Sequence, residues 1–210
     1  MQSLRRIEEL AWMNVLFYGV GGWGARKTSH TGKFNADFFL MHLVTSSLFL
    51  PSIVAYLSPS STTTLLRTFF NVSVVWWIAR GRPALPIREF YAGTTPKPAE
   101  PGAPHGTPTE KTLTPADASP NPWLPILQTT LVHPAEHLCK LQRALAHYAA
   151  HYGTVPAGHF AELARQSPGL EGAEVLDGTV FVRAAGLTAD RMGWMREGQE
   201  EMNWDRAGFF

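Results

Sequence analysis

The residues best suited to chemistry lie between Asn121 and Tyr152, where four of the eight histidines occur. An α-helix turns by about 100° per residue, so four histidines and one lysine of this stretch fall within about 40° of one direction. These residues are His133, His137, Lys140, His147 and His151. An aliphatic stripe lies beside them, made by Leu138, Leu141, Leu145 and Ala149. The stretch therefore predicts an amphipathic helix with imidazoles on its second face.

Imidazoles four residues apart on a helix can bind one metal ion, as His133 and His137 are spaced here. His147 and His151 would lie about 15 to 20 Å further along the axis, so one ion cannot use all four. The compact set is His137 with Lys140, joined by His133 if the helix start turns its ring inward. A protonated lysine repels a cation, so Lys140 would have to be neutral or carbamylated. The spacing also allows surface or core-rim histidines beside a solvated lysine, which is the more common arrangement on helices.

The elements that must position these residues are read as helices. Pro134 suits a helix start, with His133 at the cap and 123–132 as a separate helix before it or as the other limb of a kinked helix. A further helix is expected over 3–18. The apolar stretches 38–57 and 65–78 are predicted as buried core helices, the first opened by Asn35 and Asp37. Pro51 and His42 argue against a membrane span in the first of them, and a buried His42 would need a hydrogen-bond partner or a metal.

Three other segments have weaker patterns. The run from Gly19 to Gly24 matches G-x-G-x-x-G, but no strand precedes it, so a glycine-rich loop is expected rather than a dinucleotide site. Residues 92–122 carry many prolines and are predicted to form a flexible loop. Residues 171–186 suit either a hairpin turn at Asp177 or a short helix. Thr188 is then predicted to cap a last helix.

Length and composition favour one domain over residues 1–210 rather than two small ones, because 210 residues with 45% apolar content suffice for one core, and the segments described above make this domain helical. A formal charge of +1 suggests neither a nucleic-acid binder nor a trap for acidic ligands. The single Cys139 excludes a disulfide framework and favours the cytoplasm. Glu8 and Glu9 interrupt any signal peptide. Seven tryptophans and twelve phenylalanines suit a core or a pocket for a flat hydrophobic ligand.

Several long motifs resemble the questin oxidase-like family of fungal and bacterial oxidoreductases. The motifs are FNADFFLMHLVTSSLFLP, WWIARGRPAL, NPWLPILQTTLVHPAEHLCKLQRALAHYAAHYG, LDGTVFVRAAGLTAD and WDRAGFF. The resemblance runs through nearly the whole chain except the proline-rich loop. It implies a mostly α-helical fold and oxidative ring cleavage of aromatic polyketides, such as anthraquinones, in secondary metabolism. The reaction would be Baeyer–Villiger-like or dioxygenase-like.

The resemblance also implies cofactors and ligands. Non-haem iron would be held by histidines and a carboxylated lysine, which map to His42, Lys140, His137 and His133, inside an apolar interior. NADPH would donate electrons, and O₂ and the polyketide would be the partners.

Family members are expected to be about twice as long, with further histidine motifs in an N-terminal half. This chain is therefore expected to correspond to the C-terminal half of the family fold and, alone, to bind iron weakly. Two alternatives remain open at this point. One is a non-catalytic remnant or partner subunit that folds against the N-terminal half. The other is a membrane-associated helical protein using 38–57 and 65–78.

Overall fold

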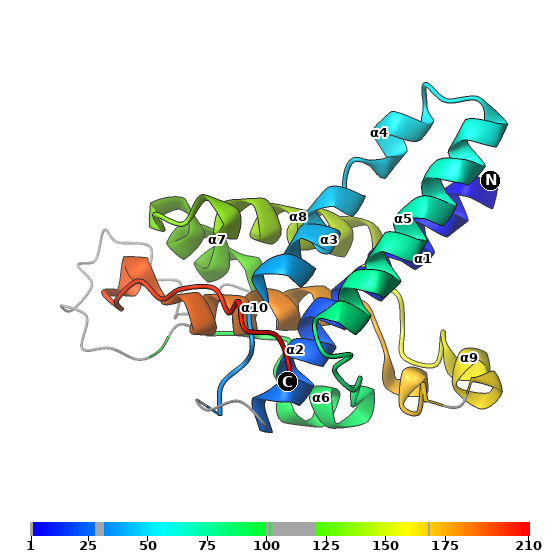
Figure 1. Ribbon diagram of the computed structural model, residues 1–210. Helices are drawn as coiled ribbons and strands as arrows, with labels where there is room; N and C mark the ends of the chain where they lie inside the picture. The colour runs from blue at the N-terminus through cyan, green and yellow to red at the C-terminus, as the bar shows by residue number, and fades with distance from the viewer. Residues whose placement is uncertain (1, 28–31, 100, 102–120, 168) are drawn as a thin grey trace.

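The computed structural model describes residues 2–27, 32–99, 101, 121–167 and 169–210, and the described chain forms helices without strands. The expected mostly α-helical single domain is confirmed (Figure 1). The α-helices are α1 (Gln2–Val15), α2 (Gly21–Gly24), α3 (Phe38–Ser47), α4 (Leu50–Val54), α5 (Pro59–Ala79), α6 (Ile87–Gly93), α7 (Trp123–Val132), α8 (Glu136–Tyr152), α9 (Ala161–Gln166) and α10 (Val180–Met192). A π-helical turn, Leu16–Val20, joins α1 to α2.

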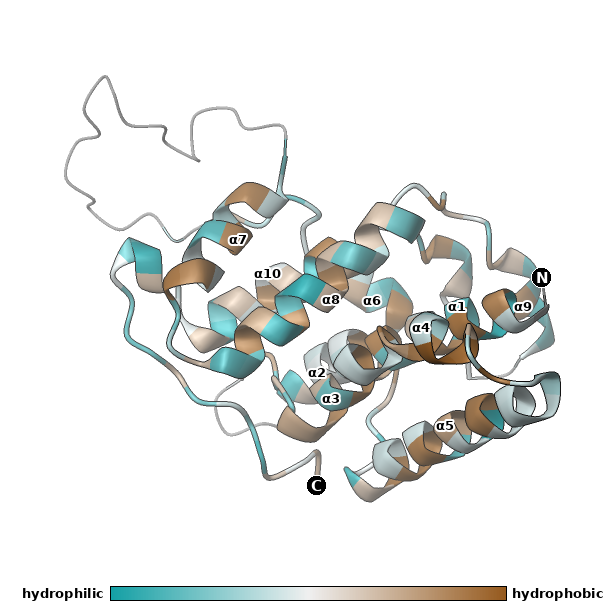
Figure 2. Ribbon diagram, turned by 90° about the horizontal axis from the view of Figure 1, so that it is seen from above, coloured by the Kyte–Doolittle hydropathy of each residue, from teal (hydrophilic) through white to brown (hydrophobic). Residues whose placement is uncertain are grey.

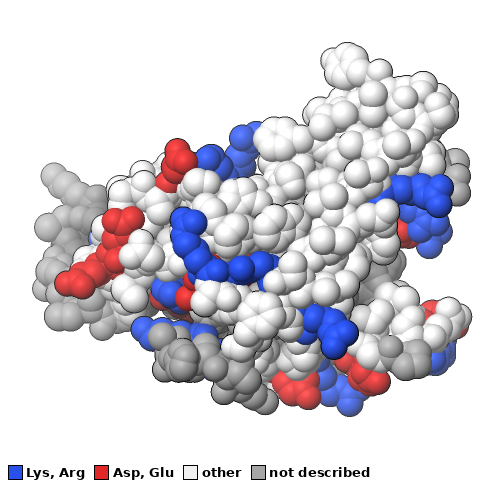
Figure 3. Space-filling model, viewed as in Figure 1, with Lys and Arg blue, Asp and Glu red and all other residues white. Residues whose placement is uncertain are grey.

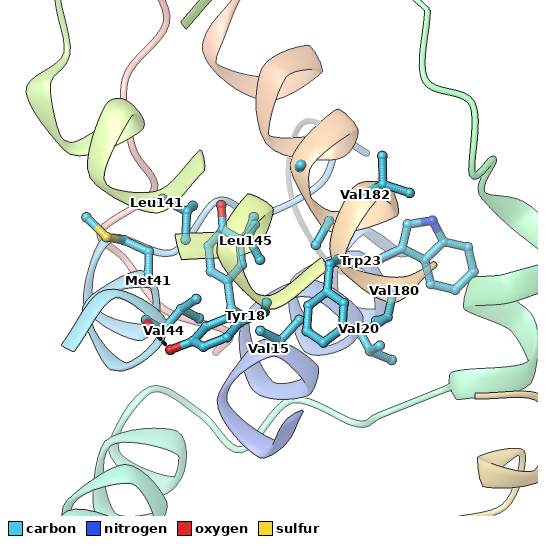
Figure 4. Packing of buried hydrophobic residues seen from close by; sticks show 14 of the residues in the cluster. Val15, Tyr18, Val20, Trp23, Met41, Val44, Leu141, Leu145, Val180 and Val182 are labelled. Carbon is cyan, nitrogen blue, oxygen red and sulfur yellow. Dashed lines mark hydrogen bonds between the residues drawn. The ribbon is translucent and has the colours of Figure 1, made fainter. Parts of the chain in front are cut away.

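The core lies where α10 is covered by α8, by the π-helical turn and by α7. Most residues of α10 are buried, including the whole run from Val180 to Gly186. Figure 4 shows that Val180 and Val182 of α10 belong to a cluster with side chains that come from α1, the π turn, α2, α3 and α8. These side chains are Val15, Tyr18, Val20, Trp23, Met41, Val44, Leu141 and Leu145. The leucine stripe predicted for α8 is thus the face that packs on the core.

The glycine run forms helix and not the expected loop. A Cβ on Gly19 would lie 3.0 Å from the Cβ of Ala184 in α10. A Cβ on Gly22 would lie 2.4 Å from the carbonyl oxygen of Asn35. Because the glycines have no side chains, this helical segment can approach its neighbours closely. Glycines allow a similarly close approach in nucleotide-binding loops. The glycine run follows helix α1 and the π-helical turn, whereas the dinucleotide motif follows a strand.

The apolar stretches 38–57 and 65–78 are only partly buried, which corrects the prediction of two core helices. The first breaks into α3, which enters the core, and α4, in which only Leu50 is buried. In α5 the buried residues are Thr62, Leu66 and Ser73. A small separate cluster of Ile7, Leu10, Leu50 and Leu66 attaches this part to α1. Figure 2 shows α5 at the edge of the molecule with apolar segments along it.

Among the helices of the described chain, none combines the length and the apolar character that a membrane crossing requires. The expected proline-rich loop 92–122 falls largely outside the described residues, because 100 and 102–120 are not described. Its first residues, Ala92 and Gly93, complete α6.

Of the two readings of 171–186, the hairpin is wrong and the helix forms, but it does not end at Gly186. Asp177 accepts hydrogen bonds from the backbone and hydroxyl of Thr179, and α10 then continues through Gly186 to Met192. Thr188 does not cap a helix, since its hydroxyl lies inside α10 and donates to the Ala184 carbonyl.

The start of α3 is fixed by Asp37, whose side chain is completely buried. One carboxylate oxygen accepts the backbone N–H groups of Phe39 and Leu40 at 2.9 and 2.8 Å and so caps the helix. The other accepts the guanidinium of Arg80 at 2.7 and 3.0 Å. The same guanidinium donates to the Arg206 carbonyl at 2.7 Å. One buried carboxylate thus connects α3, the end of α5 and the C-terminal segment.

Backbone and charge contacts strengthen this junction. Asp37 and Asp205 form an isolated parallel bridge, with the Phe38 N–H donating to the Asp205 carbonyl at 2.9 Å. The Asp205 carboxylate accepts the Ala36 N–H at 2.8 Å and the guanidinium of Arg191 at 2.7 and 3.0 Å. The C-terminal segment is therefore held beside the first turn of α3.

We predict that Asp37→Ala lowers the free energy of unfolding by about 3–5 kcal/mol, because it leaves the largely buried Arg80 without its carboxylate. Chemical denaturation monitored by circular dichroism measures this loss. Glu9→Ala serves as the control, since the pairs of Glu9 with Arg5 and Arg6 are exposed and contribute about 0–1 kcal/mol. Equal losses in the two variants would contradict the role assigned to Asp37.

Candidate functional site

Two of the sequence-predicted histidines meet at the surface between α3 and α8. The ring centroids of His42 and His137 are 5.2 Å apart, with an angle of 61° between the planes. Both rings contact Phe38, whose centroid lies 4.7 Å from that of His42 and 5.0 Å from that of His137. The fold thus brings together imidazoles that are 95 positions apart in the sequence (137 minus 42).

Hydrogen bonding defines the tautomer of His42. Its Nδ1 lies 2.6 Å from the Phe38 carbonyl oxygen, and a carbonyl can only accept, so Nδ1 carries the proton. In the neutral ring Nε2 then holds the free lone pair. The side chain is exposed, because α3 turns this position away from the core. This corrects the expectation of a buried His42.

His137 is more enclosed, with 26% of its side chain exposed, and its Nδ1 lies 3.5 Å from Glu136 Oε1. Burial lowers the pKa of His137 below its usual 6.5, and the positive charges of Lys140 and a protonated His42 lower it further. Glu136 acts in the opposite direction and Arg206 in the same direction, each with a smaller effect. The ring is therefore neutral at pH 7 and can accept a proton or bind a cation.

Lys140 lies at the surface and not in an apolar interior. Its side chain is 54% exposed, and Nζ donates to Glu136 Oε1 at 3.3 Å across one helical turn. An ammonium group suits this ion pair, whereas a carbamate would place two negative groups together. The exposed position of Lys140 therefore does not match the enclosed, carbamylated lysine that was expected. The residue still adds positive charge beside His137.

His133 has a structural role apart from the other two histidines. Its Nδ1 accepts the Ala135 N–H at 3.0 Å, just before α8 begins, so Nε2 carries the proton and donates to the Met192 carbonyl at 3.1 Å. Both ring nitrogens are thus engaged between α7, α8 and α10. This buried ring stabilises the start of α8 and does not join the His42–His137 pair.

His147 and His151 form a second pair further along α8, as their spacing predicts. Their ring centroids are 4.5 Å apart. Burial lowers the pKa of His147, and the charges of a protonated His151 and of Arg143 add to this effect.

Aromatic and cationic side chains surround the first pair. The Arg206 guanidinium carbon lies 3.8 Å from the Phe38 ring centroid, and the Trp204 ring lies 6.3 Å from it. We call Phe38, His42, His137, Trp204 and Arg206 the His42–His137 surface. In Figure 3 Lys and Arg side chains gather over the middle of the displayed face. The sequence indicated no role for Trp204 and Arg206, apart from their place in the motif WDRAGFF.

A second aromatic contact continues this surface toward α5. Phe39 stacks on Trp76 at 5.2 Å with 12° between the planes, and the Arg80 guanidinium lies 4.5 Å from the Phe39 ring centroid. Phe38 and Phe39 are 5.6 Å apart. A row of rings therefore leads from the end of α5 to the two histidines.

The described residues do not fit the implied iron centre. A non-haem iron site commonly takes two histidines and one carboxylate. Within the described ranges no group of three His, Cys, Asp or Glu side chains is arranged to hold a metal ion. Glu136 lies beside His137, but it is ion-paired with Lys140. The helical glycine run likewise offers no phosphate loop for NADPH.

We predict that Lys140→Met raises the pKa of His137, because the substitution removes a nearby positive charge. Because the pKa of His137 is lower in the folded chain than in the unfolded chain, the unfolded chain takes up the proton first as the pH falls. The free energy of unfolding therefore decreases as the pH drops below 6.5 toward the pKa of the folded chain. Titration of the His137 ring protons by NMR measures the shift. Arg67→Met on α5 provides the matched control and should leave the His137 pKa unchanged. A lower pKa in Lys140→Met would contradict the electrostatic assignment.

We further predict that the chain retains much less than one iron per molecule after anaerobic loading with Fe(II) and desalting. Two imidazoles without a third protein ligand form an incomplete set. Elemental analysis against protein concentration gives the stoichiometry. One tightly held iron per chain would show that a complete site forms.

Comparison with known proteins gives one finding. The sequence model of a family described as questin oxidase-like matches residues 2–145, more than half of the 210 residues. This range includes His42, His133, His137 and Lys140, whereas the motifs LDGTVFVRAAGLTAD and WDRAGFF lie beyond it. No curated protein and no solved structure matched the chain. The chain therefore belongs to the questin oxidase-like family, which supports an oxidoreductase-type role for it.

Proposed function

We propose that the protein takes part in the oxidative ring cleavage of an aromatic polyketide, such as an anthraquinone, by molecular oxygen. The observation that carries the proposal is the convergence of two imidazoles from separate helices on the Phe38 ring, beside Arg206. Membership of the questin oxidase-like family supports the oxidative character of the reaction.

The His42–His137 surface suits a flat, acidic aromatic ligand. Phe38 and Trp204 offer ring faces and edges for stacking. Arg206 and Lys140 offer positive charge to an ionised phenol, and a guanidinium also stacks on aromatic planes. Hydroxyanthraquinones combine these two properties, because they are planar and carry acidic phenols.

The two histidines would handle the substrate proton. His137 is neutral at pH 7, so its ring can accept a phenolic proton. The phenolate that results is richer in electrons and easier to oxidise than the phenol. Its negative charge would be stabilised by Arg206 and by Lys140. The lone pair on His42 Nε2 provides a second acceptor at the same edge.

Ring cleavage has two balanced routes. In a Baeyer–Villiger-like reaction one oxygen atom enters between the carbonyl carbon and a ring carbon. The other atom becomes water, with two electrons supplied by NADPH and two protons by NADPH and the solvent. In a dioxygenase-like reaction both oxygen atoms enter the product and no external reductant is consumed.

Incubation of the full chain with a hydroxyanthraquinone under ¹⁸O₂, with and without NADPH, tests the proposal. One labelled atom in the cleaved product with NADPH consumption supports the first route. Two labelled atoms without NADPH support the second. Absence of conversion, with and without added Fe(II), contradicts a catalytic role for the isolated chain.

A second candidate function is that of a non-catalytic partner subunit, which the incomplete metal set within the described residues favours. In that case a polypeptide corresponding to the expected N-terminal half would supply the remaining ligands. The isolated chain would then bind the aromatic ligand without converting it. The oxygen-labelling experiment and a binding titration together separate the two functions.

We predict that Arg206→Gln weakens the binding of a hydroxyanthraquinone about fivefold, since a cation beside an aromatic ring contributes on the order of 1 kcal/mol. The carbonyl that accepts from Arg80 belongs to the backbone and is retained. Quenching of tryptophan fluorescence reports the dissociation constant. Arg67→Gln, on α5, removes the same group elsewhere and should leave binding unchanged. Equal effects of both substitutions would contradict a ligand at the His42–His137 surface.

A further inference from the structure

The second histidine pair of α8 is not used by the function proposed above. His147 and His151 are exposed on the same helix, with their ring centroids 4.5 Å apart and an angle of 62° between the ring planes. The sequence from one to the other is HYAAH, which has the histidine spacing of the zinc-binding H-E-x-x-H helix. Both histidines lie beyond residues 2–145, the range that the family model matches.

Tyr148 stands where H-E-x-x-H has its glutamate. Its side chain is buried, and its hydroxyl is hydrogen-bonded to Ser47 Oγ at 2.7 Å. The position therefore supplies no general base, so the pair can bind an ion but lacks the residue that metalloproteases use to activate water.

The separation of the two rings matches that of imidazoles that share one ion. A ring nitrogen lies about 1.2 Å from its ring centroid and about 2.0 Å from a bound metal ion, so two imidazoles at a right angle on one ion have centroids about 4.5 Å apart. The two rings of this pair are 4.5 Å apart. Neighbouring ligands at a right angle are found in square-planar and tetragonal sites, which are typical of Cu(II) and Ni(II).

Buried neighbours fix the part of α8 that carries the pair. Tyr148 is anchored to Ser47 of α3, and Leu145 is completely buried in the core. The Tyr152 ring lies 6.3 Å from the Phe181 ring of α10. The backbone of this turn is therefore in place before an ion binds, and only two imidazoles have to be ordered.

The charges along this part of the chain oppose a cation less than those beside His42 and His137. Residues 144–161 include no Lys, Arg, Asp or Glu. Arg143 lies one turn before His147, but it is exposed, so water screens its charge. His151 is in the last turn of α8, where the free carbonyl groups of the helix carry partial negative charge.

We propose that His147 and His151 bind one divalent transition-metal ion, Cu(II) or Ni(II), with water in the remaining coordination positions. Two protein ligands are enough for such an open site, so the proposal does not need the group of three ligands that the described ranges lack. Fe(II) stands below Ni(II) and Cu(II) in the order of affinities, which agrees with the weak retention of iron predicted above. The inference is independent of the proposed function.

Titration of the full chain with NiCl₂, followed by calorimetry and by NMR of the histidine ring protons, tests the proposal. Ni(II) is the better probe because Cu(II) oxidises thiols and Cys139 is exposed. The tightest site should take up one ion per chain. Because Ni(II) is paramagnetic, it should broaden the ring signals of His147 and His151 before those of the other histidines.

His147→Gln and His151→Gln should each weaken the tightest site about tenfold or more, because loss of even an outer partner of a metal ligand costs about 10- to 100-fold in affinity. Both side chains are exposed, so both variants should keep the helix content of the wild type in circular dichroism. His159→Gln is the matched control, since His159 is also exposed but lies outside α8. His137→Gln is a second control, which removes one imidazole of the other pair. Neither control should change the affinity of the tightest site.

Three results would overturn the proposal. One is the absence of binding at about 1 mM Ni(II), a concentration at which even a site with a Kd of 1 mM is half filled. Another is an affinity that stays unchanged in both His147→Gln and His151→Gln. The third is broadening that begins at His42 and His137, together with loss of the tightest site in His137→Gln, since this would place the ion at the other pair.

Discussion

The buried carboxylate of Asp37 is the constraint on which the candidate site depends. A carboxylate without solvent must receive hydrogen bonds or positive charge, and it obtains them from two amides of α3 and from Arg80. Those partners lie on different segments, and Arg80 also holds the Arg206 carbonyl. The next residue after Asp37 is Phe38, so the same junction that stabilises the fold places Trp204 and Arg206 beside the ring that both histidines contact.

The charges around the histidine pair follow from this arrangement. Burial lowers the pKa of His137 most, and the nearby charges of Lys140 and Arg206 lower it further, whereas Glu136 raises it. A neutral ring can accept a proton or bind a cation, whereas a protonated ring can do neither. The surface thus combines positive side chains with basic nitrogen atoms. That combination suits an acidic aromatic ligand better than a metal ion, which would be repelled by the same cations.

The sequence predicts those features that depend on local pattern. The period of α8, the separate α7 and the polar start of α3 are all visible, because they arise from neighbours three or four residues apart. The prediction for α5 was wrong for a physical reason: hydropathy shows that Val75 and Ile78 can be buried, but no pattern tells whether anything covers them. The prediction of a loop for the glycine run was wrong for a similar reason. Gly22 has no side chain because the backbone of Asn35, on another segment, lies against it. Trp204 and Arg206 reach the site only through the tertiary junction at Asp37, so their spacing carries no signal.

A row of aromatic rings connects the end of α5 to the histidine pair. Trp76 stacks on Phe39, which contacts Phe38, and Phe38 contacts both imidazoles. Side chains in such a chain of contacts restrict one another, because packed rings have few alternative rotamers.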